Sequence, residues 1–274
     1  MLRLRPGAVF LYMQKDMGMN ILIAESKSMQ SLLEPRSMHP AATSPVYLEE
    51  AEIIMASVAG MTAPEVAGML HSSGKLGLTA IELAKAFGHT DLCLRAIDAF
   101  TGVVFRSLDA PTLDPEASNA LCSDVKIVSS VYGLLRPDDA ILPYRLDLSA
   151  KVPGMAGTLK QFWKPKLTVY AGKYLKENPE NEMLFILPSD ALGCFDLKLL
   201  RGLGNVGILE LRTYNDEGRL TTPRAERLKN RRGLFLRQIL ERGITSLEEL
   251  EHFSSPDFEY LGQEPYPGRY SFLC

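Results

Sequence analysis

The chain has little cysteine or histidine, and neither residue is grouped. Its four cysteines stand far apart among 274 residues without a CxxC pair, whereas disulfide frameworks and thiolate zinc sites need cysteines at close or regular spacing. The four histidines are equally scattered and form no HxH, HExxH or 2-His-1-carboxylate pattern. We therefore expect reduced thiols, no metal site and no cofactor.

Long hydrophobic runs are also absent. No segment approaches the roughly 18 uncharged apolar residues that a membrane span needs, and the carboxyl terminus carries neither an ER-retention signal nor a prenylation box. The apolar stretch at residues 8–13 is too short for a signal peptide, and no small-residue cleavage site follows it. We expect a cytosolic protein without membrane contact, whose residues 1–18 are a disordered extension or reflect a misplaced start codon.

An excess of basic residues is missing as well. The 30 lysines and arginines are outnumbered by 33 acidic residues, which gives a net charge of -3. Proteins that coat nucleic acid usually carry a basic footprint that neutralises several phosphates, so any such footprint must be local here. With 46% hydrophobic and 23% charged residues, the composition is that of a globular protein with a sizeable core.

Alternating helical and strand patterns predict the fold. A β-branched run at residues 19–24 is typical of an opening strand, and helical patterns dominate residues 46–100. Further strands are predicted at residues 103–105, 126–131, 183–187, 206–214, 219–222, 258–261 and 270–273, and further helices at residues 167–175, 197–203, 224–241 and after Ser246. No linker or repeat divides the chain. Residues 19–274 are therefore predicted to form one α/β (α+β) domain, a mixed sheet with flanking helices and a helical subregion at about residues 46–100.

Arginines and aromatic residues crowd into turns between Tyr132 and Trp163. This stretch begins where the predicted strand at residues 126–131 ends, and strand ends that feed loops are where α/β proteins place ligands. Arg136, Tyr144 and Arg145 are candidates, because guanidinium groups bind carboxylate or phosphate and an aromatic ring can stack on a base. The sequence thus favours an anion site along this loop.

A structural interpretation of the same loop stays open. Asp147 can orient Arg145, or the two can form an ion pair that holds a long loop beneath Tyr144. Trp163 is the only tryptophan, and a single tryptophan is more often a packing residue than a ligand platform. Asp147 and Trp163 are accordingly assigned structural roles.

The late helix at residues 224–241 carries cations on its apolar side. At 100° per residue one arc collects its large apolar residues, which are Leu228, Phe235, Leu236, Ile239 and Leu240. Arg232 projects into the middle of that arc and Lys229 lies within it. Because buried unpaired charge is costly, these two cations should snorkel, pair with acids or point into a polar cleft that accepts an anion. The remaining cations are expected on a solvated face, namely Arg224, Arg227, Arg231 and Arg237.

Ser189 and Asp190 follow the predicted strand at residues 183–187. At a strand end they can bind a ligand or assist proton transfer, or they can simply cap the next segment. No GxSxG, Walker or strand-following GxGxxG motif accompanies them. No reaction can be read from these residues alone.

Several of these segments together resemble one protein family. The most specific are YGLLRP at residues 132–137, LPYRLD at 142–147 and QFW at 161–163, which are similar to the YGxLRP, PYRLE and QFW signature of the bacterial YaaA-like peroxide-stress family. Weaker matches are FTGVVF at residues 100–105, Ser189-Asp190 at the ASDEY position and KNRRG at 229–233 at the KKARG position. The matching elements run from Met19 to about Leu261.

The resemblance implies a function and a binding mode. It implies a cytosolic protein that helps cells survive hydrogen peroxide by limiting free iron and oxidative DNA damage, and that binds DNA through a helix-hairpin-helix element and a positively lined cleft. The turn SSGKLG at residues 72–77 is compatible with that hairpin through Gly74, Lys75 and Gly77. An ordinary connection to a helix opened by Thr79 is the alternative.

Departures from the signature fall at two places. IAESK at residues 23–27 keeps Lys27 of the family's ISPAK segment but loses its serine and proline, and Ala191-Leu192 replace the acidic and aromatic residues that usually follow Ser-Asp. Any role that rests on those positions is therefore open in this chain.

Three functional hypotheses follow. The leading one is a protein that binds double-stranded DNA with the hairpin and with a cleft lined by Lys27, Arg136, Tyr144, Arg145, Lys229 and Arg232. The second is an enzyme acting on a small anionic or nucleotide substrate in the same cleft, with Lys27, Tyr144, Ser189 and Asp190 as catalytic candidates. An iron-storing protein is disfavoured, because no cluster has metal-ligand spacing.

Overall fold

The computed structural model describes residues 18–31, 41–89, 92–263 and 265–274. Of the predicted amino-terminal extension, residues 1–17 lie outside this part of the chain. Residues 32–40 also lie outside it. The predicted opening strand is confirmed as β1, Met19–Ala24.

The core of the molecule is a mixed sheet built around β1. Its strand order is β4-β3-β1-β6-β7-β10-β9, with β8 paired to β7. The other strands are β3 (Val125–Ser129), β4 (Gly133–Leu135), β6 (Glu182–Ile186), β7 (Asn205–Tyr214), β8 (Leu220–Thr221), β9 (Glu259–Gln263) and β10 (Arg269–Leu273). Apart from the predicted strand at residues 103–105, the strands predicted from the sequence are confirmed.

Parallel pairing places three strand ends side by side. β1 pairs in parallel with β3 on one side, with Ile21 opposite Val125, and with β6 on the other, with Ile23 opposite Ile186. These strands are near-continuous apolar runs, as expected for parallel strands that are covered on both faces. The chain crosses from one side of β1 to the other between β3 and β6. The carboxyl ends of β3, β1 and β6 therefore meet at a topological switch point, where open α/β sheets bind ligands.

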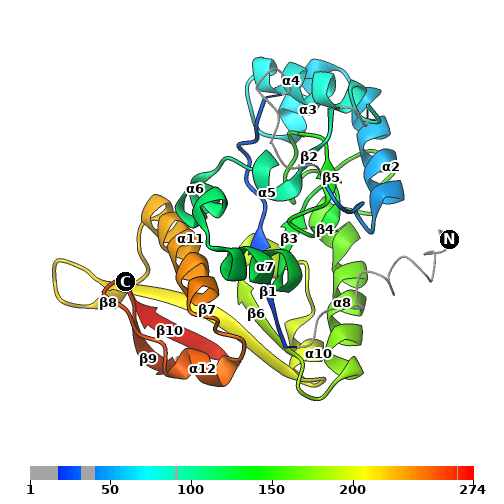
Figure 1. The fold of residues 1–274 in the computed structure, drawn as a ribbon. Helices are drawn as coiled ribbons and strands as arrows, with labels where there is room; N and C mark the ends of the chain where they lie inside the picture. Colours follow the sequence, from blue (N-terminus) through cyan, green and yellow to red (C-terminus); the bar gives the residue numbers. More distant parts are fainter. Residues whose placement is uncertain (1–17, 32–40, 90–91, 264) are drawn as a thin grey trace.

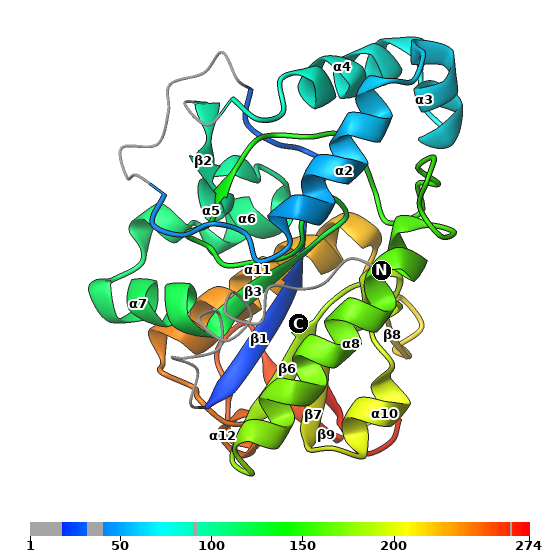
Figure 2. The same cartoon turned by 90° about the vertical axis from the view of Figure 1, so that its right-hand side faces the viewer.

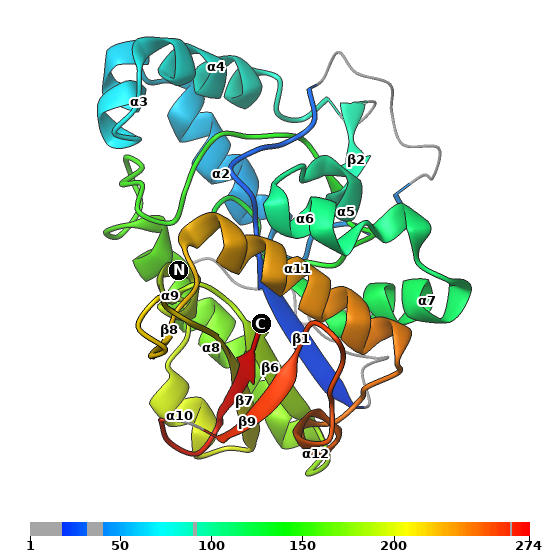
Figure 3. The ribbon, with the colours of Figure 1, turned by 90° about the vertical axis from the view of Figure 1, so that its left-hand side faces the viewer.

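Helices cover both faces of the sheet. Figure 2 shows α8 (Leu159–Glu177) and α10 (Leu197–Arg201) on one face, and Figure 3 shows α6 (Val103–Leu108), α7 (Pro115–Asp124) and α11 (Ala225–Glu241) on the other. Smaller elements complete the fold: α9 (Ser189–Leu192), α12 (Leu247–Glu251), the 3-10 turn Ala110–Thr112, and the two-stranded sheet of β2 (Leu94–Arg95) and β5 (Ala140–Ile141). None of the described helices is long and apolar enough to span a membrane.

The helical subregion lies over the carboxyl end of β1 (Figure 1). It comprises α2 (Leu48–Ala59), α3 (Ala63–Met69) and α4 (Gly74–Lys85), with α5 (Ala96–Ala99) nearby. A capping box opens α3, in which the Thr62 N–H donates to Glu65 Oε2 at 2.7 Å. The subregion thus forms a second layer above the switch point.

The predicted glycine turn is shorter than expected. The link between α3 and α4 ends at Ser73, and Gly74 already begins α4. Thr79 is therefore not a cap; it lies inside α4 and its hydroxyl donates to the Lys75 carbonyl at 3.1 Å. Gly77 serves helix packing, because a Cβ at this position would lie 2.5 Å from the Ala63 carbonyl oxygen.

Two further predictions were wrong about local structure. The segment at residues 103–105, predicted as a strand, is the first part of α6. Its backbone packs against α11 so closely that a Cβ at Gly233 would lie 2.2 Å from the Val104 carbonyl oxygen. The helix predicted to begin at Leu167 begins at Leu159 and contains Pro165 in its interior.

Candidate functional site

Polar residues follow each of the three strands that meet at the switch point. Glu25 comes directly after β1, Ser129 ends β3 and is followed by Ser130, and Asp190 lies in α9 just after β6. The loop that carries Tyr144 closes over this edge from the other side, since Tyr144 hydrogen-bonds both Ser129 and Glu25. The strand ends and the loop thus form one polar cluster.

The carboxyl group of Glu25 is the most perturbed acid of the cluster. Its Oε2 accepts hydrogen bonds from the Ser130 N–H at 2.8 Å and from the Tyr144 hydroxyl. Glu25 as a residue is partly exposed, but its carboxyl group is enclosed by protein. Burial raises the pKa of Glu25 to about 7; the hydrogen bonds from Tyr144 and Ser130 lower it in part, and the charge of Asp147 raises it. Glu25 therefore changes charge near neutral pH.

The hydroxyl groups beside Glu25 form a chain with a fixed direction. Ser129 Oγ accepts the N–H groups of Val131 at 3.3 Å and Tyr132 at 3.0 Å. Both of its acceptor sites are then in use, so its hydrogen must go to the Tyr144 oxygen, 2.7 Å away. The Tyr144 hydrogen in turn points to Glu25. Burial raises the pKa of Tyr144 well above its usual range, and Tyr144 acts here as a neutral hydroxyl.

A pocket of about 660 Å³ opens beside this cluster. One wall comes from the segment after β1 and from the tyrosine loop, and it carries Lys27, Tyr144 and Arg145. The opposite wall is α4, with Leu76, Thr79, Glu82 and Leu83, and the remaining lining includes Met29 and Pro143. The volume lies in the range of small-molecule sites. Two cations lie on one side, and the α4 side combines the apolar Leu76 and Leu83 with Thr79 and the acid Glu82.

Lys27 and Arg145 are held in place by the loop itself. Lys27 Nζ lies 2.9 Å from Asp147 Oδ2, and the Arg145 guanidinium donates to the Lys27 carbonyl oxygen. An ion pair between Arg145 and Asp147 was one interpretation of the sequence, but Asp147 pairs with Lys27 instead. Burial tends to raise the pKa of Asp147, yet hydrogen bonds from Ser149 and Lys27 hold it below its usual range. The Lys27 side chain is still 64% exposed and so remains accessible to a ligand.

A third cation, Arg232, approaches the same edge from α11. Arg232 is half-buried and donates one hydrogen bond, to the Leu187 carbonyl at 3.3 Å. Burial lowers the pKa of Arg232, and the charge of Asp190 opposes this shift. The prediction that Arg232 points inward is therefore confirmed. Its guanidinium keeps donors that the structure does not use among the described residues.

Cys194 lies close to both carboxylates. Burial raises the pKa of Cys194 to about 12, the charges of Glu25 and Asp190 add to this effect, and Lys160 opposes it. A thiol in this state is neutral at pH 7 and a weak nucleophile. Both Glu25, after β1, and Asp190, in α9, are close enough to Cys194 to affect its pKa. These two ends of the cluster therefore lie near one another.

Other predicted site residues lie apart from the pocket. Lys229, expected within the core-facing arc of α11, is exposed, because the first turns of this helix extend past the residues that cover the rest of it. Arg136 lies in the turn before β5, where its N–H donates to Asp139 at 2.8 Å, and it does not line the pocket. Ser189 is exposed in the first turn of α9.

Of the four cations expected on a solvated face of α11, two are exposed and two are partly buried. Arg231 pairs with Asp257 at 2.8 Å, and Arg237 pairs with Glu241 at 2.7 Å. Both are partly buried, because they connect α11 to neighbouring segments. Arg224 and Arg227 are exposed as predicted.

Trp163 supports the cluster from behind. It is fully buried, and its Nε1 donates to the Ser130 carbonyl at 2.8 Å. The indole ring packs against the turn at Gly133, which has a φ of 69°, and a Cβ there would lie 2.6 Å from the ring. Only glycine combines this φ with such an approach. The structural role predicted for Trp163 thus fits its position.

Sequence reasoning missed Glu25, Ser129 and Cys194 as parts of the cluster. The available signal for Glu25 was a single acid directly after an apolar strand at a position where the family signature has no acid. Among the described residues, no group of three or more His, Cys, Asp or Glu side chains could hold a metal ion. The cluster consists of hydroxyl, carboxyl and cationic groups.

The fold and this edge define a mixed α/β protein with a cation-flanked pocket at the switch point of its sheet. The chain belongs to the family described as Peroxide stress protein YaaA, which it matches over residues 19–264. The resemblance predicted from the sequence motifs is thereby confirmed.

Similar proteins are named UPF0246 protein. One from Lactiplantibacillus plantarum is 26% identical over 256 residues, covering 93% of this chain and 99% of the relative. One from Ruegeria sp. (strain TM1040) is 27% identical over 256 residues with the same coverage, and one from Shewanella woodyi is 28% identical over 234 residues, covering 82% of this chain and 90% of the relative. The likeness thus extends over nearly the whole fold.

Proposed function

We propose that this member of the YaaA family acts in the cytosol during peroxide stress, where it binds duplex DNA and limits free iron and oxidative DNA damage. One observation carries the DNA-binding part. The helix α4, which contains the predicted hairpin residues, forms one wall of the pocket whose other wall presents Lys27 and Arg145. The predicted hairpin and the predicted cationic cleft, which were inferred separately from the sequence, thus lie next to each other.

The contact with a phosphate backbone uses exposed charges of both walls. Lys75 is exposed in the first turn of α4, and Lys27 is exposed across the pocket. Together with Arg145 they form a local basic surface on a chain with a net charge of -3. Such a surface binds DNA with an affinity that falls with salt, because each phosphate contact releases counterions.

Duplex binding at several salt concentrations tests this proposal. We expect a measurable affinity at low salt and a linear fall of log K with log salt. Arg145→Ala and Lys75→Ala should each weaken binding and reduce the salt slope by about 1. Arg219→Ala is the matched control, because Arg219 is 79% exposed, pairs with Glu217 and does not line the pocket. Binding that is absent, or equally weakened by the control, contradicts the proposal.

The iron part is tested in cells. In a strain that lacks the protein, hydrogen peroxide should leave more unincorporated iron, measured by electron paramagnetic resonance, and more DNA lesions than in the parent strain. Complementation with the wild-type gene should restore both values. Complementation with the Arg145→Ala variant should restore neither if the pocket carries the function.

An enzyme acting on a small anionic or nucleotide substrate is the second candidate. The enclosed carboxyl of Glu25 favours it, because a group that titrates near pH 7 beside a pocket is typical of acid–base sites. Adenosine 5′-monophosphate is a suitable probe. If it binds the wild type and not Arg145→Ala, while duplex DNA binds neither, the second candidate holds and the first does not.

A further inference from the structure

The pocket beside α4 carries charge of opposite sign on its two walls. Lys27 and Arg145 lie on the wall formed by the segment after β1 and the tyrosine loop, and Glu82 lies on the α4 wall. Glu82 is exposed, and its side chain makes no hydrogen bond or ion pair with the described residues. The two cations therefore leave this acid unneutralised, although all three residues line the same space.

The basic wall has donors left for an anion. The Arg145 guanidinium uses one terminal nitrogen for the Lys27 carbonyl oxygen, and within the described part of the chain its other nitrogens donate to nothing. Lys27 Nζ pairs with Asp147, yet the Lys27 side chain is largely exposed. A phosphate group fits this wall, because a guanidinium and an ammonium offer several donors to its oxygens.

The α4 wall requires the opposite kind of group. Leu76 and Leu83 flank Glu82 on this wall, and Met29 and Pro143 extend the apolar lining. A carboxylate only accepts hydrogen bonds, so a molecule in the pocket must present donors where it meets Glu82. The apolar lining beside the acid suits a flat ring that carries these donors on one edge.

Guanine is the nucleobase that matches such a wall. Its Watson–Crick edge places the N1–H and N2–H groups side by side, so both can donate to the two oxygens of one carboxylate. Adenine and cytosine place a ring nitrogen acceptor next to their amino group, and thymine and uracil have one N–H between two carbonyl oxygens. In each of these other bases an acceptor would face the carboxylate.

We propose that the pocket binds a guanine nucleotide, with its phosphate on Lys27 and Arg145 and its base on the α4 wall, and that Glu82 selects the base. The proposal rests on the anion binding proposed above and adds the group at the other end of the bound molecule. A volume of about 660 Å³ holds one nucleotide. The nucleotide can be free or an unpaired residue of a strand, because the recognised chemistry is the same.

Calorimetry with the 5′-monophosphates of guanosine, inosine and adenosine tests the base preference. The wild type should bind guanosine 5′-monophosphate about tenfold to a hundredfold more tightly than adenosine 5′-monophosphate, the discrimination of a bidentate base contact. Inosine 5′-monophosphate lacks the N2 amino group and should lie between the two. Equal affinity for all three overturns the proposal, and the anion site then still stands if Arg145→Ala weakens their binding.

Glu82→Gln tests the residue that selects the base. The amide offers one acceptor and two donors, so guanosine 5′-monophosphate should lose its advantage. Adenosine 5′-monophosphate should bind at least as tightly as it binds the wild type, because an amide matches the donor and acceptor of adenine. The variant should fold normally, because Glu82 is exposed and its side chain has no partner among the described residues. A guanine preference that survives this change contradicts the proposal.

Two further variants serve as controls. Glu52→Gln removes an exposed glutamate on α2 that does not line the pocket, and it should keep the full guanine preference. Arg145→Ala should weaken all three nucleotides by a similar factor and keep their order, because it acts on the phosphate end. Loss of the preference in Glu52→Gln would show that the acid of the pocket does not select the base.

Single-stranded oligonucleotides that differ by one guanine or adenine identify the source of the nucleotide. Tighter binding of the guanine strand, lost in Glu82→Gln, supports recognition within a strand. A preference seen with the monophosphates alone supports a free guanine nucleotide. If neither the monophosphates nor the strands bind the wild type, the anion site and the guanine proposal are both refuted.

Discussion

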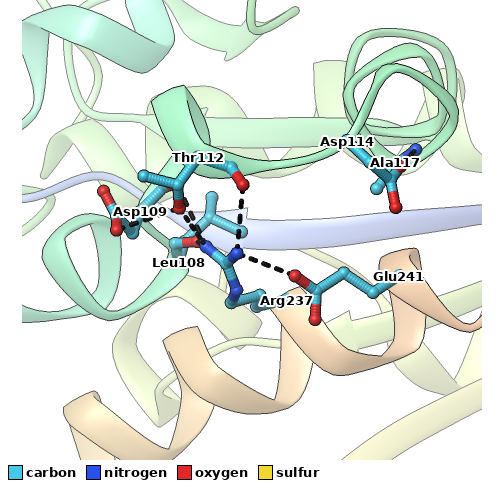
Figure 4. Close-up of polar contacts among 7 residues, drawn as sticks. All are labelled: Leu108, Asp109, Thr112, Asp114, Ala117, Arg237 and Glu241. Carbon is cyan, nitrogen blue, oxygen red and sulfur yellow. Dashed lines mark hydrogen bonds and ion pairs between the residues drawn. The ribbon is translucent and has the colours of Figure 1, made fainter.

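Two arginines on α11 show how two regions of the molecule use positive charge. Arg237 lies where α11 meets α6, and both terminal nitrogens of its guanidinium are hydrogen-bonded (Figure 4). Its acceptors are the carbonyl oxygens of Leu108 at 3.0 Å, Asp109 at 3.1 Å and Thr112 at 3.3 Å, the Thr112 hydroxyl at 2.8 Å and the Glu241 carboxylate at 2.7 Å. Arg232, at the edge of the sheet, makes one hydrogen bond of 3.3 Å.

The difference separates a structural cation from an available one. A guanidinium offers five N–H donors, and around Arg237 the segment from Leu108 to Thr112 supplies three backbone carbonyl acceptors. At the switch point, Arg232 donates only to the Leu187 carbonyl among the described residues. We infer that the seam between α6 and α11 is built for stability, and that the switch-point edge retains unused binding capacity.

The largest effect should come from the seam. In Gly233→Ala the new Cβ would lie 2.2 Å from the Val104 carbonyl oxygen and 2.8 Å from Ser107 Cβ, so α6 and α11 must separate. We expect a loss of about 3 kcal/mol in the free energy of unfolding, measured by urea denaturation. Gly68→Ala is the matched helix control, because a Cβ at Gly68 would meet nothing within 4 Å. Equal stability of the two variants would show that the seam is not tightly packed.

Arg237→Met should have the next largest effect. It leaves the backbone carbonyls at the end of α6 without their donor, and we expect a loss of about 2 kcal/mol in the free energy of unfolding. Binding of duplex DNA or adenosine 5′-monophosphate should be unchanged in the folded variant. A variant that keeps its stability but binds more weakly would reverse the roles assigned to Arg237 and Arg232.

Glu25→Gln should change stability with pH in a defined direction. The pKa of Glu25 is raised from an ordinary value of 4.5 to about 7 in the folded protein, so the folded state binds this proton more tightly than the unfolded state. Its contribution is full below about pH 4.5 and is lost as the pH rises through 7. At pH 8 the variant should therefore be more stable than the wild type, by about 1 to 2 kcal/mol. At pH 4.5 the two should be alike, and a constant difference across this range would contradict the assignment.

The smallest change in stability is expected for Arg232→Met. Because Arg232 makes a single long hydrogen bond and Met can fill the space of its stem, the free energy of unfolding should change by less than about 0.5 kcal/mol. Anion binding should weaken about threefold to tenfold, measured by titration with the duplex or with adenosine 5′-monophosphate. Large destabilisation without a change in binding would place Arg232 with Arg237 as a structural cation.

The sequence predicted the sheet better than the short segments around it. Apolar runs such as Met19–Ala24 and the strand at residues 183–187 form strands because both faces of a parallel strand are buried, a pattern that is visible locally. Residues 103–105 share that apolar, β-branched character, yet they lie in a helix because close packing of α6 on Gly233 outweighs local propensity. The helix predicted from residue 167 begins at Leu159 and tolerates Pro165 in its interior, because Pro165 is exposed and solvent can satisfy the carbonyl that loses its hydrogen bond.

The candidate site was predicted only in part, because its chemistry depends on long-range contacts. Lys27, Tyr144 and Arg145 could be named from composition, turn signals and a family signature. The pairing of Glu25 with Tyr144 joins residues 119 positions apart, and the pKa of Glu25 depends on burial that no local pattern reports. Lys229 was misplaced because helical periodicity assigns a face to a helix and does not say where along its length the core ends.

Trp163 gives the molecule a built-in optical reporter. It is the only tryptophan in the chain, and its indole N–H is bonded to the carbonyl of Ser130, the residue whose own N–H holds Glu25. Emission from this fluorophore arises from a single environment within two hydrogen bonds of the Glu25 carboxyl group. Its intensity and wavelength can therefore follow both ligand capture and the titration of Glu25 in the unlabelled protein.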